Sequence, residues 1–116
     1  MAESRTISQH FDGKDPAVKS IYERILKESR KFGKVIEDPK KTSIHLVNKS
    51  AFAGVTTRKS ALILNIKSAA PIKHARIKKS EQISASRFHQ EVKLVSPKEV
   101  DSTLIGWLKE AYALSS

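Results

Sequence analysis

The sequence predicts an α+β domain in which an N-terminal and a C-terminal helix pack on one face of an antiparallel sheet of about five to six strands. Two observations support this prediction. Near each end of the 116-residue chain the apolar residues recur every three or four positions, which is the spacing of an amphipathic helix. Between these segments they recur at every second residue, and short loops divide the alternating stretch, which favours antiparallel hairpins.

The first helix is predicted over residues 16–32. Asp15 can cap its start, Pro16 suits the first helical position, and Gly33 can end it. Its apolar stripe consists of Val18, Ile21, Tyr22, Ile25 and Leu26. We expect residues 1–12 to form a flexible tail or a short turn that carries Phe11, and residues 13–116 to form a single domain of ordinary size.

The strands are expected between the two helices. They lie near residues 34–37, 42–48, 51–58, 61–67, 74–79 and 87–95. Turn-forming residues break the pattern at Asp38-Pro39, Asn48-Lys49, Lys59-Ser60 and Ala70-Pro71. The short loops indicate a meander in which successive strands are neighbours.

The second helix is predicted over residues 97–113. Ser96 can cap it, Pro97 follows, and Glu99 stands where the carboxylate of a capping box reaches back. Gly106 is unfavourable inside a helix, and we expect it to permit close packing. The apolar stripe of this helix consists of Val100, Leu104, Trp107, Leu108, Ala111 and Tyr112.

Alternation assigns each strand residue to one of two faces. The face turned toward the helices should hold Ile44, Leu46, Ala51, Ala53, Val55, Leu62, Leu64, Ile66, Phe88, Val92 and Leu94. The opposite face should stay open, because no remaining segment can cover it. It should carry Ser43, His45, Phe52, Thr56, Arg58, Asn65, Lys67, Arg87, His89, Glu91 and Lys93.

Positive charge is concentrated in the middle of the chain. The formal net charge is +10, and residues 39–80 contain ten Lys or Arg side chains but no Asp or Glu. Outside this window the acidic and basic residues balance. A segregated excess of one sign creates a local field that attracts polyanions. Basic pairs recur three times in the window. Protection of apolar strands against aggregation requires only one flanking charge beside each strand, so this purpose does not explain the pairs.

We therefore predict a surface that binds nucleic acid or another polyanion, with basic side chains on phosphates and Phe52 stacked on a base. The candidate residues are Lys40, Lys41, Lys49, Phe52, Arg58, Lys59, Lys73, Arg76, Lys78 and Lys79. Phosphate contacts alone give little sequence specificity. In the alternative interpretation the window is only a solvated basic face, and Phe52 fills the core or a dimer seam.

Catalysis is a second hypothesis, although we do not expect it. His45 and His89 could act as general acid and base in a toxin-like ribonuclease that needs no metal, but hydrogen-bonded surface histidines explain them more simply. Glu91 and Lys93 match the Glu-x-Lys end of a metal-dependent nuclease core. Such a site needs a second carboxylate on an adjacent strand, and the only acid nearby, Glu81, is expected at a strand end. We predict no metal site and no cofactor.

Three segments resemble a bacterial family. They read HFDGKDPAVKSIYERI, DPKKTSIHLVNKSAFAGVTTRKSALILNIK and FHQEVKLVSPKEVDSTLIGWLKEAYAL, and residues from about 10 to 114 are similar to the domain of unknown function numbered 5655. The resemblance implies no established activity and no catalytic residues. In other chains this domain looks like an appendage to nuclease-like domains, which agrees with a role near nucleic acid.

The sequence thus favours a non-catalytic cytoplasmic module that binds nucleic acid or another polyanion. A metal-independent ribonuclease is one alternative, and a protein-interaction module whose acidic partner covers the basic face is the other. The chain contains no cysteine, which suits a reducing cytoplasm. The N-terminal residues contain no apolar core of signal-peptide length, and no apolar run reaches the roughly 20 residues of a membrane span, so we expect no membrane partner.

Overall fold

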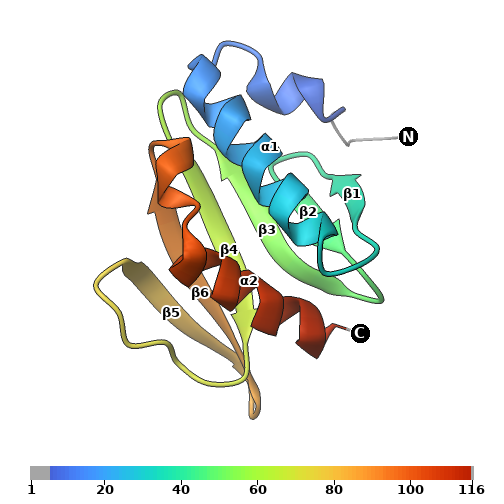
Figure 1. Cartoon of the computed structure of the whole chain (residues 1–116), viewed down its shortest axis with the longest axis vertical. Coiled ribbons are helices and arrows are strands. Elements are labelled where there is room, and N and C mark those ends of the chain that lie inside the picture. Colours follow the sequence, from blue (N-terminus) through green and yellow to red (C-terminus); the bar gives the residue numbers. More distant parts are fainter. Residues whose placement is uncertain (1–5, 116) are drawn as a thin grey trace.

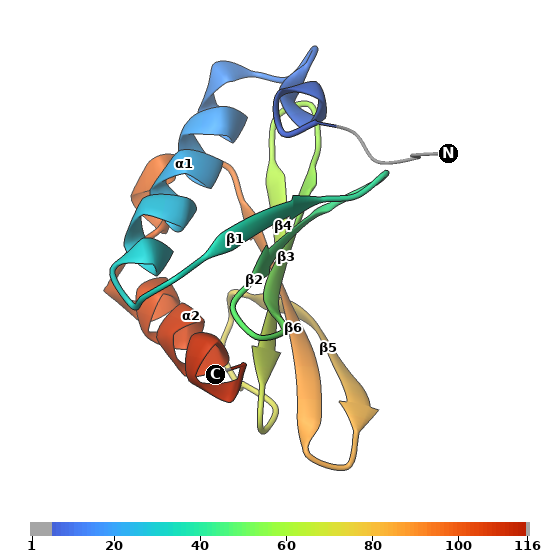
Figure 2. The same ribbon diagram turned by 90° about the vertical axis from the view of Figure 1, so that its right-hand side faces the viewer.

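Residues 6–115, which the computed structural model describes, form a six-stranded antiparallel sheet with two α-helices on one side (Figure 1). Seen from the side, both helices lie on the same face and leave the opposite face uncovered (Figure 2). The predicted α+β class is therefore confirmed. Residues 1–5 of the expected tail lie outside the described residues, and a short 3-10 helix carries Phe11. In the described part, neither helix has the length and apolar character to cross a bilayer.

The elements follow the predicted order closely. They are η1 (Ser8–Phe11), α1 (Pro16–Arg30), β1 (Ile36–Pro39), β2 (Ile44–Val47), β3 (Ala51–Thr57), β4 (Leu62–Ser68), β5 (Ile77–Ser84), β6 (Arg87–Leu94), η2 (Pro97–Glu99) and α2 (Ser102–Leu114). Each strand overlaps its predicted segment. The largest shift is in β5, which starts three residues later than predicted and runs to Ser84.

The strand order is β1-β2-β3-β4-β6-β5, so the predicted meander is wrong after β4. Strand β6 pairs with β4, and β5 pairs only with β6 at the edge of the sheet. Strands β4 and β5 therefore run in the same direction with antiparallel β6 between them. The loop of residues 69–76 returns along the sheet to the start of β5, as the yellow segment of Figure 1 shows.

Helix α1 starts where the sequence predicts and ends two residues earlier. Asp15 occupies the N-cap position, but its side chain makes no capping hydrogen bond. The hydroxyl of Tyr22 donates a 2.5 Å hydrogen bond to Glu37 of β1. Burial, and then this hydrogen bond, raise the pKa of Tyr22 above its usual range. The bond fastens α1 to the edge strand of the sheet.

The predicted second helix is divided in two. The capping box of Ser96 and Glu99 is present, but it starts the 3-10 helix η2. Helix α2 begins only at Ser102, where the side chain of Asp101 accepts a 3.1 Å hydrogen bond from the Leu104 N–H. The prediction of one continuous helix from residue 97 is therefore wrong, because two caps follow each other in the chain.

The loop of residues 69–76 is fastened to α2. The guanidinium of Arg76 donates two hydrogen bonds to the Asp101 carboxylate, at 3.0 and 3.1 Å, and a third of 2.7 Å to the Glu99 carbonyl. The ring of His74 lies edge-on to Trp107, with the ring centroids 5.1 Å apart. These contacts hold the loop on the helix side of the molecule.

The core lies between the helices and the covered face of the sheet. Four of the five residues in one transverse row across the strands are completely buried, and this row consists of Ile44, Val55, Leu64, Val92 and Ile77. Helix α1 covers it with Val18, Ile21 and Ile25, and α2 with Leu104 and Leu108. The predicted helix-facing residues are thus confirmed along β2, β4 and the second half of β6.

The face assignment fails at the start of β3. The register shifts after Leu46, so that Val47 lies opposite Ala51 instead of Phe52. The extra residue of this β-bulge reverses the alternation, which turns Phe52 toward the helices and Ala51 toward the open face. Phe52 is 1% exposed, and its ring packs edge-on against Tyr112 of α2 with centroids 5.3 Å apart. The prediction that Phe52 stacks on the open face is wrong.

Gly33 and Gly106 offer a matched pair of alanine substitutions. Gly33 has a φ of 150°, and an added Cβ would lie 2.5 Å from the Tyr112 hydroxyl. At Gly106 an added Cβ meets nothing within 4 Å, so the expectation that this residue permits close packing is wrong. We expect Gly33→Ala to lower the free energy of unfolding by about 1–3 kcal/mol, because it clashes and strains the backbone. We expect Gly106→Ala to raise it by about 0.5–1 kcal/mol.

Urea denaturation followed by tryptophan fluorescence measures both changes, because Trp107 lies on α2. The two variants should shift the midpoint in opposite directions. Equal shifts would contradict the assigned packing of Tyr112 over Gly33.

Asp101 supports a second stability prediction. Its hydrogen bond from the Leu104 N–H, and then the Arg76 guanidinium, hold the pKa of Asp101 below its usual range. We expect Asp101→Ala to cost about 0.5–2 kcal/mol, and Asp101→Asn less, because asparagine still caps the helix. Because the pKa is lower in the folded state, the Asp101 carboxylate stabilises the fold fully at pH values above its unfolded-state pKa of about 4. This stabilisation is lost as the pH falls through the folded-state pKa. The denaturation midpoints of wild type and Asp101→Asn should therefore become equal in acid. A difference that does not depend on pH would contradict this role of Asp101.

Candidate nucleic-acid interface

The open face of the sheet is formed by the strand residues that point away from α1 and α2 (Figure 2). The cross-strand pairs place the paired strand residues that were predicted for the open face on that face, with Ala51 in the position expected for Phe52. Hollows indent the face, and we call them the central, corner and side hollows.

The central hollow has a volume of about 270 Å³ and extends over β2, β3, β4 and β6. Gly54 lies directly between His45 and Asn65 in one transverse row. An added Cβ at Gly54 would lie 3.7 Å from Cδ2 of His45, so the imidazole lies beside this bare stretch of backbone. Among the described residues that line the hollow, none carries a carboxylate. Its polar lining consists of Thr42, Ser43, His45, Thr56, Asn65, Lys67 and His89.

The corner hollow lies beside the β3–β4 turn and has a volume of about 550 Å³. Its cations are Arg58, Lys59 and Lys93, and its apolar surface comes from Ile63 and Val95. Within residues 6–115, none of these three cations has an ion-pair partner. The turn itself is fixed, because the backbone N–H of Asp15 donates a 2.8 Å hydrogen bond to the carbonyl of Lys59.

The corner and central hollows are neighbours on the same face. Thr56, which lines the central hollow, lies directly opposite Ile63, which lines the corner hollow. Ile63 in turn lies opposite Lys93 on β6. A strip whose described lining residues include no carboxylate therefore runs from the β3–β4 turn to the middle of the sheet.

The side hollow has a volume of about 240 Å³ and shares Asn65 and His89 with the central hollow. Its other lining residues are Lys79, Glu81 and Glu91. Glu81 lies within β5, opposite His89, so the expectation that it stands at a strand end is wrong. Among residues 6–115, however, no group of three metal-ligating side chains is arranged to hold a metal ion.

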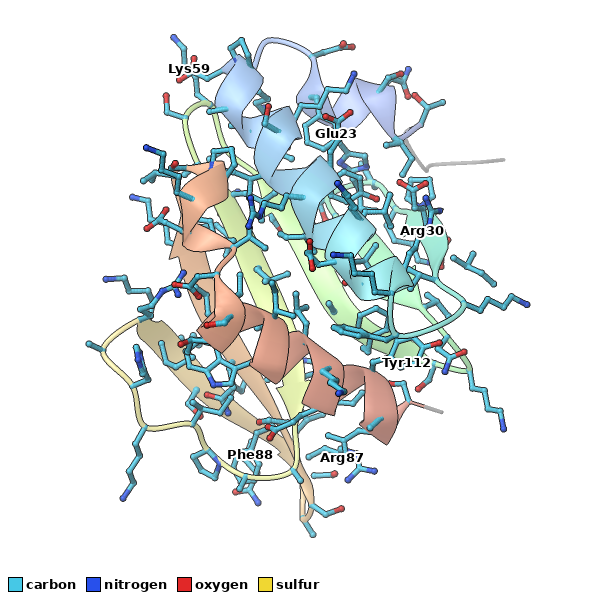
Figure 3. All side chains as sticks on the ribbon, in the orientation of Figure 1. Glu23, Arg30, Lys59, Arg87, Phe88 and Tyr112 are labelled. Atoms are coloured by element: carbon cyan, nitrogen blue, oxygen red, sulfur yellow. The ribbon has the colours of Figure 1, made fainter. Side chains whose placement is uncertain are left out.

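The ten basic residues of the central window do not form one patch. Four of them flank the end of the sheet at which β2 and β4 start, namely Lys40, Lys41, Arg58 and Lys59, whereas Lys78 and Lys79 lie within the edge strand β5. Lys49 lies in the turn at the other end, and Lys73 lies in the loop before β5. Figure 3 shows Lys59 of the window at one end of the molecule, and Arg87, a cation from outside the window, at the other.

Acidic residues from outside the window neutralise part of its charge. Arg76 is bound by Asp101 on the helix side, and the Lys40 ammonium lies 2.9 Å from the Asp38 carboxylate. Lys79 lies directly opposite Glu91. We therefore leave Arg76, together with the buried Phe52, out of the interface.

Both histidines of the ribonuclease hypothesis line the central hollow. Strands β2 and β6, which carry His45 and His89, are separated by β3 and β4. Three interstrand spacings amount to about 14 Å between their backbones. The structure thus brings the two imidazoles to one hollow, on opposite sides of Gly54 and Asn65.

Two cations that belong to the hollows were absent from the predicted binding set. Lys93 lies outside the basic window and reaches the corner hollow only because β6 pairs with β4. The Lys67 ammonium donates hydrogen bonds to the Ser115 and Ser50 hydroxyls, at 2.9 and 3.1 Å. Burial, and then the Arg87 cation, lower the pKa of Lys67. Alternation placed both lysines on the open face, and that signal could have identified them.

No curated protein and no solved structure matches the chain. A family profile does match, and its description is "Domain of unknown function (DUF5655)". The match spans residues 7–115, which is nearly the whole chain, and confirms the resemblance carried by the three sequence segments. The chain belongs to the DUF5655 family.

Proposed function

We propose that the open face binds single-stranded nucleic acid through its phosphates and does not cleave it. The observation that supports this proposal best is the strip formed by the corner and central hollows. Its described lining residues include Arg58, Lys59, Lys93 and Lys67 but no carboxylate. Phosphates could therefore bind along it with Glu91, which lies opposite Asn65 on β6, as the carboxylate beside the strip.

The cations are spaced along the strip. From Ala61 to Lys67 the chain advances six residues, which corresponds to about 20 Å along β4. Several consecutive phosphates fit over that length. Arg58 can bind a phosphate with two parallel hydrogen bonds, whereas the lysines act as point charges. A bound phosphate would also favour the charged form of Lys67, whose pKa is lowered first by burial and then by the Arg87 cation.

Individual nucleotides suit the hollows better than a rigid duplex does. Depressions of about 270 and 550 Å³ can admit single bases, and the bare backbone at Gly54 leaves room for a flat group. Since Phe52 is buried, bases would stack on the imidazoles of His45 and His89 or on the guanidinium of Arg58. The hydroxyls and the amide of the central hollow supply neutral hydrogen bonds.

Cleavage of RNA is the second candidate, because His45 and His89 line one hollow. General acid–base catalysis requires both groups within hydrogen-bond reach of the reacting atoms. The strands that carry them lie about 14 Å apart and the two residues belong to different transverse rows, so a phosphate would have to sit midway between the two rings. We favour binding because it needs only the charges and hydroxyls of the strip.

The salt dependence of binding tests the proposed function. If about four phosphates are neutralised on a single strand, log K should fall with log salt at a slope near −3. Raising the salt from about 50 to about 200 mM should then weaken binding by tens of fold. The double variant Arg58→Glu/Lys59→Glu should flatten this slope and remove most of the binding, with stability little changed because both side chains are exposed. Fluorescence anisotropy with a labelled oligonucleotide measures both effects.

The matched control is Lys27→Glu/Lys109→Glu, which changes the net charge equally on exposed positions of α1 and α2. It should retain most of the affinity and the salt slope. Equal losses in the two double variants would mean that only net charge matters. Binding of an acidic protein but of no oligonucleotide would favour the protein-interaction alternative.

Intact RNA is the expected outcome of a cleavage assay. Incubation of a labelled single-stranded RNA with the protein, with and without a chelator, should leave its length unchanged on a denaturing gel. His45→Ala and His89→Ala should weaken binding without affecting RNA length, by about severalfold to tens of fold, as expected for loss of one stacking contact or hydrogen bond each. Chelator-resistant cleavage that either substitution abolishes would establish the ribonuclease instead.

A further inference from the structure

Two glutamates interrupt an otherwise basic face. Glu81 and Glu91 line the side hollow, beside Asn65 and His89, which it shares with the central hollow. In the part of the chain that the structure describes, neither carboxylate forms an ion pair or a side-chain hydrogen bond. Their oxygen atoms are therefore available to donors of a ligand.

These carboxylates would repel a phosphate, so they need a different ligand group. Glu91 lies directly opposite Asn65 on β4 and Lys79 on β5, in the row that also contains Gly54 and His45. A phosphate bound in the central hollow would leave its base free to reach this row. In this row the Glu91 carboxylate can accept hydrogen bonds from a base, and the Asn65 side-chain amide can donate one.

The edges of the four bases differ in what they present to such a pair. A carboxylate accepts hydrogen bonds from N–H groups, such as the N4 amino group of cytosine or the ring N1–H and the N2 amino group of guanine. The amide of Asn65 can at the same time donate to a carbonyl such as O6 of guanine. Uracil has two carbonyls and a single N–H, so it satisfies the carboxylate less well. Guanine matches the pair best.

We propose that Glu91 and Asn65 read one base of the bound strand and prefer guanine to uracil. This inference rests on the proposed function, since it places the phosphate of that nucleotide in the acid-free strip. His89, which lines both hollows, covers the face of the base. The open face thus combines a phosphate-binding strip with a base-reading site.

Three labelled RNA dodecamers test the proposal, consisting of uridine alone, of repeating UUG, and of repeating UUI. Inosine keeps the carbonyl and the N1–H of guanosine but lacks its amino group. We expect the UUG strand to bind about tenfold more tightly than the uridine strand, with the UUI strand between them. The affinities are measured by anisotropy at one salt concentration, because phosphate contacts contribute equally to all three strands.

Glu91→Gln separates base reading from simple repulsion. It should weaken binding of the UUG strand severalfold and strengthen binding of the uridine strand, because a negative charge is removed. Glu110→Gln, at an exposed position of α2, is the control with the same change of charge and should leave the order of affinities unchanged.

The outcomes distinguish this proposal from the proposed function. If none of the strands binds, the proposed function itself fails. If all three bind with equal affinity, or if Glu91→Gln strengthens them all alike, the phosphate-binding strip stands and base reading is overturned.

Discussion

One face of the sheet is buried under two helices, and the open face exists because that packing is one-sided. The transverse row that includes Ile44, Leu64 and Val92 is removed from water by side chains of α1 and α2. Burial of such aliphatic side chains contributes about 1.5–3 kcal/mol each and dominates the stability of a small domain. The two helices precede and follow the strands in the chain, and within residues 6–115 both pack on the same face, which leaves the opposite face of the strands open (Figure 2).

Polar atoms attach the outer parts of the fold to this core. The Tyr22 hydroxyl donates a hydrogen bond to Glu37 and so holds the edge strand β1 to α1. Arg76 bonds Asp101 and so holds the crossing loop to the start of α2. Both links lie on the helix side. Within residues 6–115, the cations and histidines of the open face take no part in these two links. Lys67 donates hydrogen bonds to Ser50 and Ser115, Arg87 donates one to the Ser86 carbonyl, and Lys40 pairs with Asp38.

Local patterns in the sequence predicted much of this architecture, and long-range pairing accounts for most of what they missed. Helical spacing identified both helices, and alternation identified each strand, because these periods reflect burial along a single element. The place of β6 beside β4 depends on which strands meet, and alternation carries no information about that. The bulge at Phe52 inserts one residue, and one residue is enough to exchange the two faces.

The candidate site was predicted in part for the same reason. The basic pair Arg58-Lys59 lies in a tight turn, so its position follows from the hairpin. Lys93 and Glu91 join it only through the pairing of β6 with β4. The acid-free window also overstated the segregation of charge. Asp38, just before the window, pairs with Lys40, and folding brings Asp101 to Arg76 and places Glu91 opposite Lys79.

The pairing of β4 with β6 also joins two parts of the sheet, within each of which every strand pair connects strands that are consecutive in the chain. The hairpin of β5 and β6 closes locally, whereas strands β1 to β4 form a meander of their own. The central and side hollows both contain residues from each part, since Asn65 comes from β4 and His89 from β6. Local opening of the sheet at this seam would therefore separate the two halves of both hollows. A ligand that bridges the seam binds only the closed sheet, so it would stabilise the joint between the two parts against opening.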